Sequence, residues 1–167
     1  GIRAAGQTAQ TRYLLVRSRL TPSLEERHPM TPFHLAFPIR DIEETRQFYG
    51  DVLGCPLGRF TDSWIDFDLF GHQMSGHVRP GVGADTSPGV VDGHSVPIPH
   101  FGAVLRMEDW KALAARLEAA EGIDWIMKPS LRFEGQPGEQ ATMFIRDPSG
   151  NALEFKGFVD LGQVFAS

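Results

Sequence analysis

The sequence has almost no cysteine, since Cys55 is the only one among 167 residues. A single thiol excludes a framework of disulfides within the chain. Scarce cysteine fits a protein of a reducing compartment, and we therefore predict a cytoplasmic location. Cys55 follows Gly54 directly after a predicted helix, where a small packed residue is more usual than a reactive thiol.

The sequence also lacks long apolar runs and an excess of positive charge. No stretch of about 18 consecutive apolar residues occurs, so we predict no membrane-spanning helix. The net charge is −5, the pI is near 5.6, and no basic stripe is present. We therefore expect neither nucleic acid nor an anionic membrane as a partner. Hydrophobic residues make up 41% of the chain, enough for a sizeable core.

Residues 1–29 differ in character from the remainder of the chain. They show no clear strand alternation and carry four arginines before the first acidic residue, Glu25. Serine and arginine without acidic residues are a weak sign of a transit peptide. A disordered or partner-wrapping arm is the favoured interpretation, with Met30 as an alternative start. We therefore predict an N-terminal extension over residues 1–29.

The rest of the sequence is one pattern written twice. In the first copy, residues 30–78, a predicted strand precedes a helix that begins near Asp41 and stops at Gly54, and three strand candidates come after it. The second copy, residues 100–158, repeats this order around a helix that stops at Gly122. The predicted fold class is therefore α+β, with two βαβββ modules. Residues 79–99, rich in proline and glycine, form a predicted connection without a regular element, and residues 159–167 form a tail.

Three residues far apart in the chain, His34, His100 and Glu154, are candidate metal ligands. In each of their strands, apolar residues alternate with them, so all three fall on the face opposite the helix. If the free faces of two curved sheets meet, these side chains converge on one site. Two neutral imidazoles and one carboxylate suit a divalent first-row metal and leave coordination positions open for a substrate.

Three motifs resemble the vicinal oxygen chelate superfamily, which includes glyoxalase I, bleomycin-resistance proteins, fosfomycin-resistance proteins and extradiol dioxygenases. They are the strand opening Phe33-His34-Leu35-Ala36-Phe37, the helix segment Phe48-Tyr49 followed by Val52-Leu53-Gly54, and the turn Asp147-Pro148-Ser149-Gly150 that leads to Glu154. The likeness spans about residues 31–158. It implies paired βαβββ modules that form cupped sheets around one metal, with His34, His100 and Glu154 as its ligands.

Within the superfamily, residues 64–73 are similar to a small group of predicted extradiol-type dioxygenases. That resemblance implies an oxidoreductase with Fe(II) that acts on a small bidentate, catechol-like substrate, with Zn, Ni or Mn as alternative metals. Phe144 departs from the pattern, because extradiol enzymes carry a tyrosine there, and residues 135–138 lack their upstream histidine. The alternatives are a glyoxalase-type lyase or isomerase with Zn or Ni, and a protein that binds a small molecule without catalysis.

Further residues complete the predicted site. His77 lies in the last strand of the first module, from which glyoxalases take a fourth ligand, and it is also the candidate for proton transfer because imidazole titrates near neutral pH. Gln140, Thr142 and Phe144 share one face of the strand beside Glu154, where we predict that they line the substrate pocket. Because two-module proteins of this kind often pair modules across subunits, the resemblance also implies a homodimer.

Overall fold

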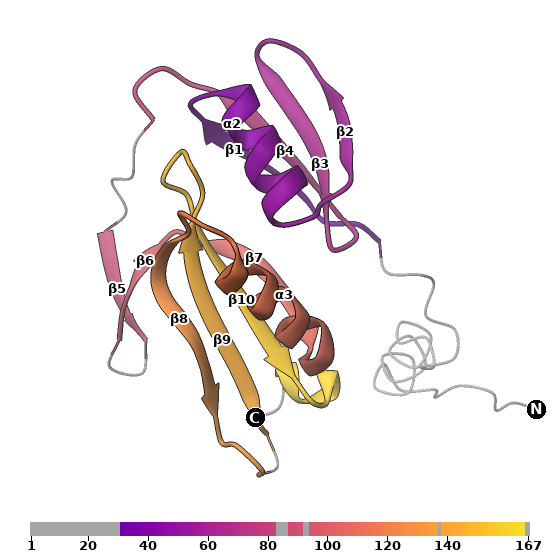
Figure 1. The fold of residues 1–167 in the computed structure, drawn as a ribbon, viewed down its shortest axis with the longest axis vertical. Helices are drawn as coiled ribbons and strands as arrows, with labels where there is room; N and C mark the ends of the chain where they lie inside the picture. The colour runs from indigo at the N-terminus through magenta and orange to yellow at the C-terminus, as the bar shows by residue number, and fades with distance from the viewer. Residues whose placement is uncertain (1–30, 83–86, 92–93, 137, 166–167) are drawn as a thin grey trace, which may run out of the picture. The chain divides into compact units, whose positions relative to one another are not determined.

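The structure, a computed structural model, describes residues 31–82, 87–91, 94–136 and 138–165. Residues 33–167 form one unit, in which the two predicted modules succeed each other along the chain (Figure 1). The predicted extension, residues 1–29, lies outside the described residues. None of the described helices has the length and hydrophobicity that crossing a bilayer requires.

The first module has the predicted β-α-β-β-β order. Its sheet is ordered β1-β4-β3-β2, with β1 parallel to β4 and the other pairs antiparallel. Asp41 caps the helix, because its carboxylate accepts a hydrogen bond of 2.8 Å from the backbone N–H of Glu44. Gly54, with a φ of +79°, comes after the helical segment in the left-handed conformation that glycine adopts without strain. The elements are β1 (His34–Ile39), α2 (Ile42–Arg46), the π-helical turn η2 (Gln47–Val52), β2 (Leu57–Phe60), β3 (Trp64–Leu69) and β4 (His72–Val78).

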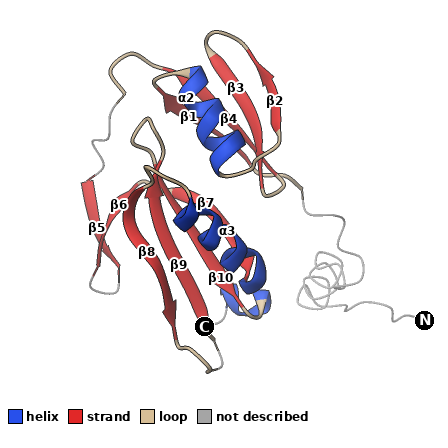
Figure 2. Cartoon of the chain, viewed as in Figure 1, coloured by secondary structure: helices blue, strands red, loops and turns tan. Residues whose placement is uncertain are grey.

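The second module repeats this arrangement. Its sheet is ordered β7-β10-β9-β8, again with the first strand parallel to the last, and α3 lies across one face of it (Figure 2). The indole N–H of Trp110 fixes the helix to the sheet by donating to the carbonyl oxygen of Phe155 at 2.9 Å. The elements are β7 (Phe101–Arg106), α3 (Met107–Ala119), β8 (Asp124–Arg132), β9 (Gln140–Arg146) and β10 (Ala152–Phe158), with the 3₁₀ turn η3 (Leu161–Phe165) after them.

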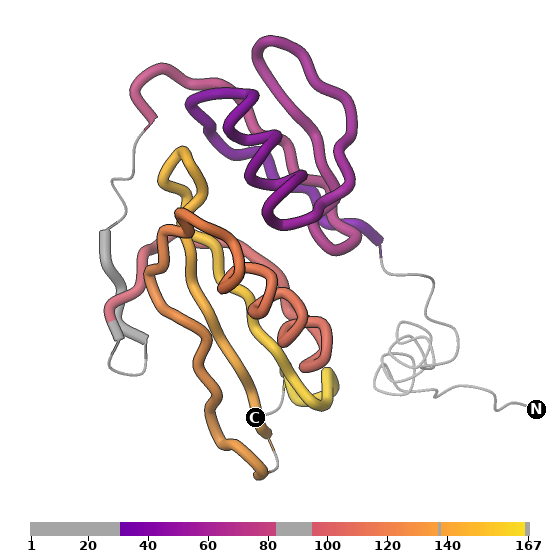
Figure 3. Tube along the Cα trace, viewed as in Figure 1, coloured from indigo at the N-terminus to yellow at the C-terminus, as the bar shows by residue number. Residues whose placement is uncertain are grey.

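The connection between the modules differs from the prediction. The sequence predicts no regular element in residues 79–99, whereas the structure has an antiparallel ribbon there, β5 (Ser87–Val91) and β6 (His94–Ile98). Pro88 and Pro97 lie opposite each other in this ribbon. Both strands are edges, where a proline need not donate to a further strand, so the prolines that suggest a loop are compatible with pairing. Figure 3 traces the chain through the strands and helices of the two modules, from β1 to β4 and from β7 to β10.

Alternating burial sets the two faces of each sheet. In β1, Phe37 and Ile39 are buried, whereas His34 and Ala36 are not. The same alternation in β10 buries Phe155 and leaves Glu154 partly open. Apolar side chains therefore pack beneath the helices and polar side chains occupy the opposite face, as the period of two predicts.

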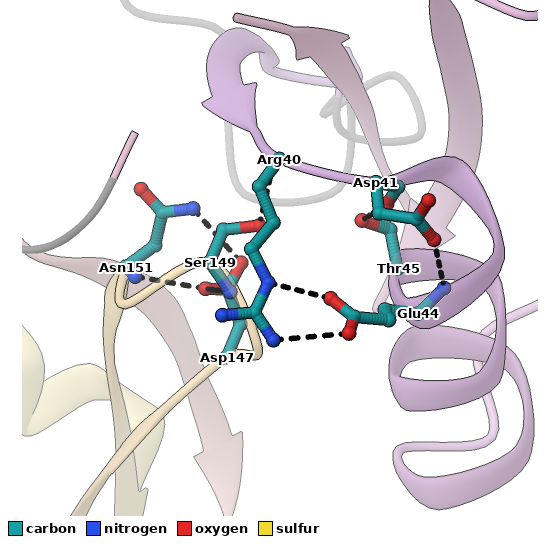
Figure 4. A network of polar contacts seen from close by, with 7 residues as sticks. All are labelled: Arg40, Asp41, Glu44, Thr45, Asp147, Ser149 and Asn151. Atoms are coloured by element: carbon teal, nitrogen blue, oxygen red, sulfur yellow. Dashed lines mark hydrogen bonds and ion pairs between the residues drawn. The ribbon is translucent and has the colours of Figure 1, made fainter. Parts of the chain in front are cut away.

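A buried turn at residues 147–151 is held together by one carboxylate (Figure 4). Asp147 Oδ1 accepts hydrogen bonds from the backbone N–H groups of Ser149 and Asn151, at 2.9 and 2.8 Å. Its Oδ2 accepts from the side-chain amide of Asn151 at 2.9 Å. Burial raises the pKa of Asp147, and these hydrogen bonds counteract part of that effect.

The same turn joins the two modules. The hydroxyl of Tyr49, which is fully buried, donates to Asp147 Oδ2 at 3.0 Å across 98 positions of sequence. The backbone N–H of Arg40 donates to the hydroxyl of Ser149 at 2.9 Å, and the amide of Asn151 donates to the carbonyl of Pro38 at 2.9 Å. The end of β1 and the helical segment are thereby tied to the turn that precedes β10.

Replacing Tyr49 by phenylalanine tests this link. The variant keeps the ring stacked on Phe67, with centroids 4.1 Å apart, but removes a buried donor to Asp147. We expect a loss of about 1–3 kcal/mol in the free energy of unfolding at neutral pH, measured by chemical denaturation.

The pH dependence gives the same test a second measurement. The pKa of Tyr49 is raised well above 10.0, first by burial and then by the charge of Asp147. A raised pKa means that Tyr49 contributes stability fully below its unfolded pKa and loses it as the pH rises further. The difference in the free energy of unfolding between wild type and Tyr49→Phe should therefore become smaller above pH 10. Arg46→Ala is the control, because the exposed Arg46 side chain pairs with Glu43 rather than with the turn; an equal loss in both variants would contradict the link.

Candidate metal centre and pocket

Two of the three predicted metal ligands meet in the second module. His100 lies directly before β7, and Glu154 lies in β10, the strand that pairs with β7. The imidazole Nε2 of His100 is 3.2 Å from Glu154 Oε2. Both side chains are largely buried, with 25% of the imidazole and 14% of the carboxylate exposed. Gly102, beside Glu154 in the register, makes the approach of the strands possible, because a Cβ there would overlap the Glu154 carbonyl oxygen.

The imidazole of His100 is held in one orientation. Its Nδ1 lies 2.7 Å from the carbonyl oxygen of Pro97, and its ring meets Phe144 edge to face with centroids 5.1 Å apart. A carbonyl oxygen can only accept, so Nδ1 carries the proton in this contact. If the ring is neutral, the nitrogen that faces the carboxylate of Glu154 is Nε2 with its lone pair.

If neither carries a proton, His100 Nε2 and Glu154 Oε2 are two hydrogen-bond acceptors that only a cation could hold 3.2 Å apart. A lone pair and a carboxylate oxygen repel each other unless the imidazole is protonated or a metal binds both. Two atoms that ligate one metal at about 2.0–2.2 Å lie roughly 2.8–3.6 Å apart at octahedral to tetrahedral angles. The observed separation of 3.2 Å falls in that range, so the pair fits a divalent metal.

Glu154 is oriented by its neighbours. The hydroxyl of Thr142 in β9 donates to Glu154 Oε1 at 2.9 Å, and the ammonium group of Lys156 lies 3.8 Å from Oε2. Thr142 thus fixes one carboxylate oxygen and leaves the other towards His100. Such outer contacts set the direction of a ligand and tune its affinity for the metal.

The pair forms part of a cavity of about 470 Å³ on the free face of the second sheet. Gln140, Thr142 and Phe144, the residues predicted to line a substrate pocket, all border this cavity; their contact with a substrate stays a prediction. Arg132 and Lys156 also border it, so its walls carry positive charge beside the carboxylate of Glu154. The volume suits a small ligand rather than a polymer.

His34 does not join the pair within one chain. It is exposed on the free face of β1, in register with Gln73 of β4. In the part of the chain that the structure describes, no three histidine, cysteine, aspartate or glutamate side chains gather closely enough to hold a metal. The role of His34 as a ligand therefore stays a prediction.

The first module also places His77 and a carboxylate that the sequence analysis overlooked. His77 is partly buried in β4, in register with Pro38 and Trp64. Two positions earlier, the hydroxyl of Ser75 donates to Asp66 Oδ1 at 2.5 Å. The alternation of β3 already puts Asp66 on the free face, since Ile65 and Phe67 are buried on the other. The contact of Asp66 with Ser75 could not be predicted from this alternation, because it depends on the register of β3 with β4.

A family model and a solved structure that match this chain carry the same superfamily description. The model of the glyoxalase/bleomycin resistance protein/dioxygenase superfamily matches residues 31–155. A solved structure described as a glyoxalase/bleomycin resistance protein/dioxygenase from Alicyclobacillus acidocaldarius is 35% identical, with a TM-score of 0.65 over 83% of this chain and 99% of that one. No curated protein matches this chain.

More distant structures share the fold alone. A virulence protein from Salmonella typhimurium is 22% identical, with a TM-score of 0.53 over 80% of this chain and 100% of its own. Lactoylglutathione lyase from Agrobacterium tumefaciens is 16% identical, with a TM-score of 0.50 over 84% of this chain and 100% of its own.

Replacing Thr142 by valine tests whether the carboxylate is set for a metal. Valine keeps the shape of the side chain but removes the hydrogen bond to Glu154 Oε1. We expect the affinity for a divalent cation, measured by titration with Co²⁺, to fall about 10- to 100-fold. Thr61→Val, at an exposed turn where the hydroxyl contacts Ser63, should bind as the wild type does. Unchanged affinity in Thr142→Val would show that the contact does not serve metal binding.

Proposed function

This chain belongs to the glyoxalase/bleomycin resistance protein/dioxygenase superfamily, and from that membership and the geometry of His100 and Glu154 we propose that it is a metal-dependent enzyme. In our proposal it is a dioxygenase-like oxidoreductase of the extradiol-like group that uses Fe(II) and acts on a small bidentate oxygenated substrate. Members of the superfamily typically bind divalent metals and include lyases and dioxygenases, so the fold is compatible with this chemistry.

One observation carries the proposal. His100 Nε2 and Glu154 Oε2 lie 3.2 Å apart, while the other ring nitrogen of His100 is occupied by the Pro97 carbonyl. With a neutral ring, this arrangement leaves a lone pair facing a carboxylate, and a cation bound to both removes the repulsion; a protonated ring would form an ion pair instead. A metal ligand needs the hydrogen bond on Nδ1, because it fixes the tautomer that ligates through Nε2.

The cavity supplies the remaining requirements of such a site. When bound, the metal withdraws charge from the oxygens of a chelating substrate and, if it is iron, can hold O₂ beside it. The edge of Phe144 packs on His100, and Thr142 holds Glu154, so both ligands keep their directions. Lys156, next to Glu154 and bordering the cavity, can hold the negative charge of a substrate oxygen at this position.

We further propose that the active protein is a homodimer in which His34 of one copy completes the site of the other. His34 is exposed on a free sheet face, and one chain gathers only two of the three candidate ligands among its described residues. A second copy that brings its first module to the cavity would supply the missing imidazole. The site would then hold two histidines and one carboxylate, the set that suits a non-haem iron with open positions.

A second function is favoured by Phe144. This residue stands where extradiol enzymes carry a tyrosine, and it is 4% exposed and packed on His100. A phenyl ring can neither donate nor accept a proton, so ring cleavage of a catechol would need another group for that role. A glyoxalase-type lyase or isomerase with Zn or Ni, with His77 as fourth ligand, would not need the tyrosine.

Metal analysis of protein purified without oxygen separates these functions. We expect about one iron per chain and consumption of O₂ on addition of substrates from a panel of catechols. Glu154→Gln should lose most of the iron, because it replaces a charged ligand by a neutral amide. Bound Zn or Ni with no O₂ uptake would reject the dioxygenase and leave the lyase or isomerase.

Mixing two inactive variants tests the shared site. His34→Ala and Glu154→Gln should each lose the metal as separate homodimers. After the two are dissociated and reassociated together, half of the dimers are mixed, and each mixed dimer contains one intact and one doubly altered site. Metal content should then recover to about a quarter of the wild-type value.

The control for this experiment mixes His100→Ala with Glu154→Gln. Both residues belong to the same module, so a mixed dimer contains no intact site and no recovery is expected. If the first mixture also fails to recover although mixed dimers form, His34 does not act across subunits.

A further inference from the structure

The internal repeat allows each residue of the second-module site to be matched with a position in the first module. His34 and His100 are matched by the repeat, and the residues after them pair in the same way: Leu35 with Met74, and Phe101 with Leu153. The next residue of each last strand is therefore equivalent as well. Ser75 stands in the first module where Glu154 stands in the second.

Although a serine replaces the glutamate at this position, a carboxylate lies beside it. Its side chain is 5% exposed, and its hydroxyl donates to Asp66 Oδ1 at 2.5 Å from the strand beside it. Asp66 and Ser75 are direct partners in the register of β3 and β4. The other carboxylate oxygen of Asp66 is 3.4 Å from the amide nitrogen of Gln73, the residue in register with His34. The carboxylate thus leans over β4 towards the strand of His34.

Each module has a hydroxyl that holds a carboxylate on a neighbouring strand, although the two pairs do not occupy equivalent positions in the register. In the second module, the hydroxyl of Thr142 in β9 holds the carboxylate of Glu154 in β10. In the first module, the hydroxyl is on the last strand and the carboxylate is on the strand before it. A hydroxyl that orients a carboxylate is the outer contact that metal ligands commonly have.

We propose that Asp66, oriented by Ser75, is the carboxylate that the first module contributes to the metal centre. This inference rests on the proposed function, because it requires a metal held between a first and a second module. The first module then supplies His34 and Asp66, and the second supplies His100 and Glu154. Two carboxylates and two neutral imidazoles balance the charge of a divalent cation.

His77 is less well placed for this role. Pro38 pairs with His77 and Val104 pairs with Lys156, so His77 is equivalent to Lys156 rather than to Glu154. It lies two residues further along β4 than Ser75, which is about 6–7 Å along a strand. In this arrangement His77 borders the site and does not ligate the metal.

Titration of the full-length protein with Co²⁺ tests the proposal, with visible absorption as the readout of the ligand set. Asp66→Asn keeps the shape of the side chain and should lower the affinity for Co²⁺ by about 10-fold or more, with a changed spectrum. Ser75→Ala, which removes only the orienting hydroxyl, should lower the affinity about 10-fold and leave the spectrum close to that of the wild type.

Asp68→Asn is the matched control. Asp68 lies on the same strand and the same face as Asp66, but its carboxylate is exposed and caps the turn at Gly71. This variant should bind Co²⁺ as the wild type does. His77→Ala should also keep the wild-type affinity, since His77 is assigned no metal contact.

The outcomes separate this inference from the function on which it rests. If Asp66→Asn and Ser75→Ala keep the wild-type affinity and spectrum while His34→Ala and Glu154→Gln lose Co²⁺, the assignment of Asp66 is wrong and the metal enzyme stands. If His77→Ala loses Co²⁺ and Asp66→Asn does not, the fourth ligand is His77. If the wild-type protein binds neither Co²⁺ nor Fe²⁺, both proposals are overturned.

Discussion

The carboxylate of Asp147 is the constraint on which the fold depends. It accepts two backbone and two side-chain hydrogen bonds, so a charge that burial would otherwise disfavour is compensated on every side. The turn that it closes leads directly into β10, and Tyr49 joins the turn to the helical segment of the first module. The position of Glu154 is therefore set by contacts that involve both halves of the chain.

In the second module, contacts with neighbouring residues hold His100 and Glu154 in fixed orientations. His100 is fixed by the Pro97 carbonyl and Phe144, and Glu154 by Thr142. Each partner removes a freedom that the side chain would otherwise have, so the approach of nitrogen and oxygen is built into the protein itself. A preorganised pair of this kind does not have to be reordered when a cation binds.

The two modules share a topology and differ in their polar contacts. Both copies keep the parallel pairing of first and last strands and the polar free face. They differ in their polar contacts: Ser75 bonds to Asp66, its direct register partner, whereas Glu154 bonds to Thr142, two residues from its register partner Phe144.

The sequence by itself determined the two βαβββ modules, the face on which each polar residue lies and the family. These depend on local features: a period of two, a helix cap at Asp41 and the turn Asp147-Pro148-Ser149-Gly150. Gln140, Thr142 and Phe144, which alternate along one strand, border the cavity, and their contact with a substrate stays a prediction. The ribbon in residues 79–99 was missed, since proline hides the pairing of two edge strands.

Only the tertiary structure decided which side chains touch. The contacts of Tyr49 with Asp147, Thr142 with Glu154 and Ser75 with Asp66 depend on strand register and on packing between distant segments. Register changes neighbours across a sheet without changing the alternation along a strand, so no local pattern records it. For the same reason the sequence grouped His34 with His100 and Glu154, whereas one chain, over its described residues, brings only the last two together.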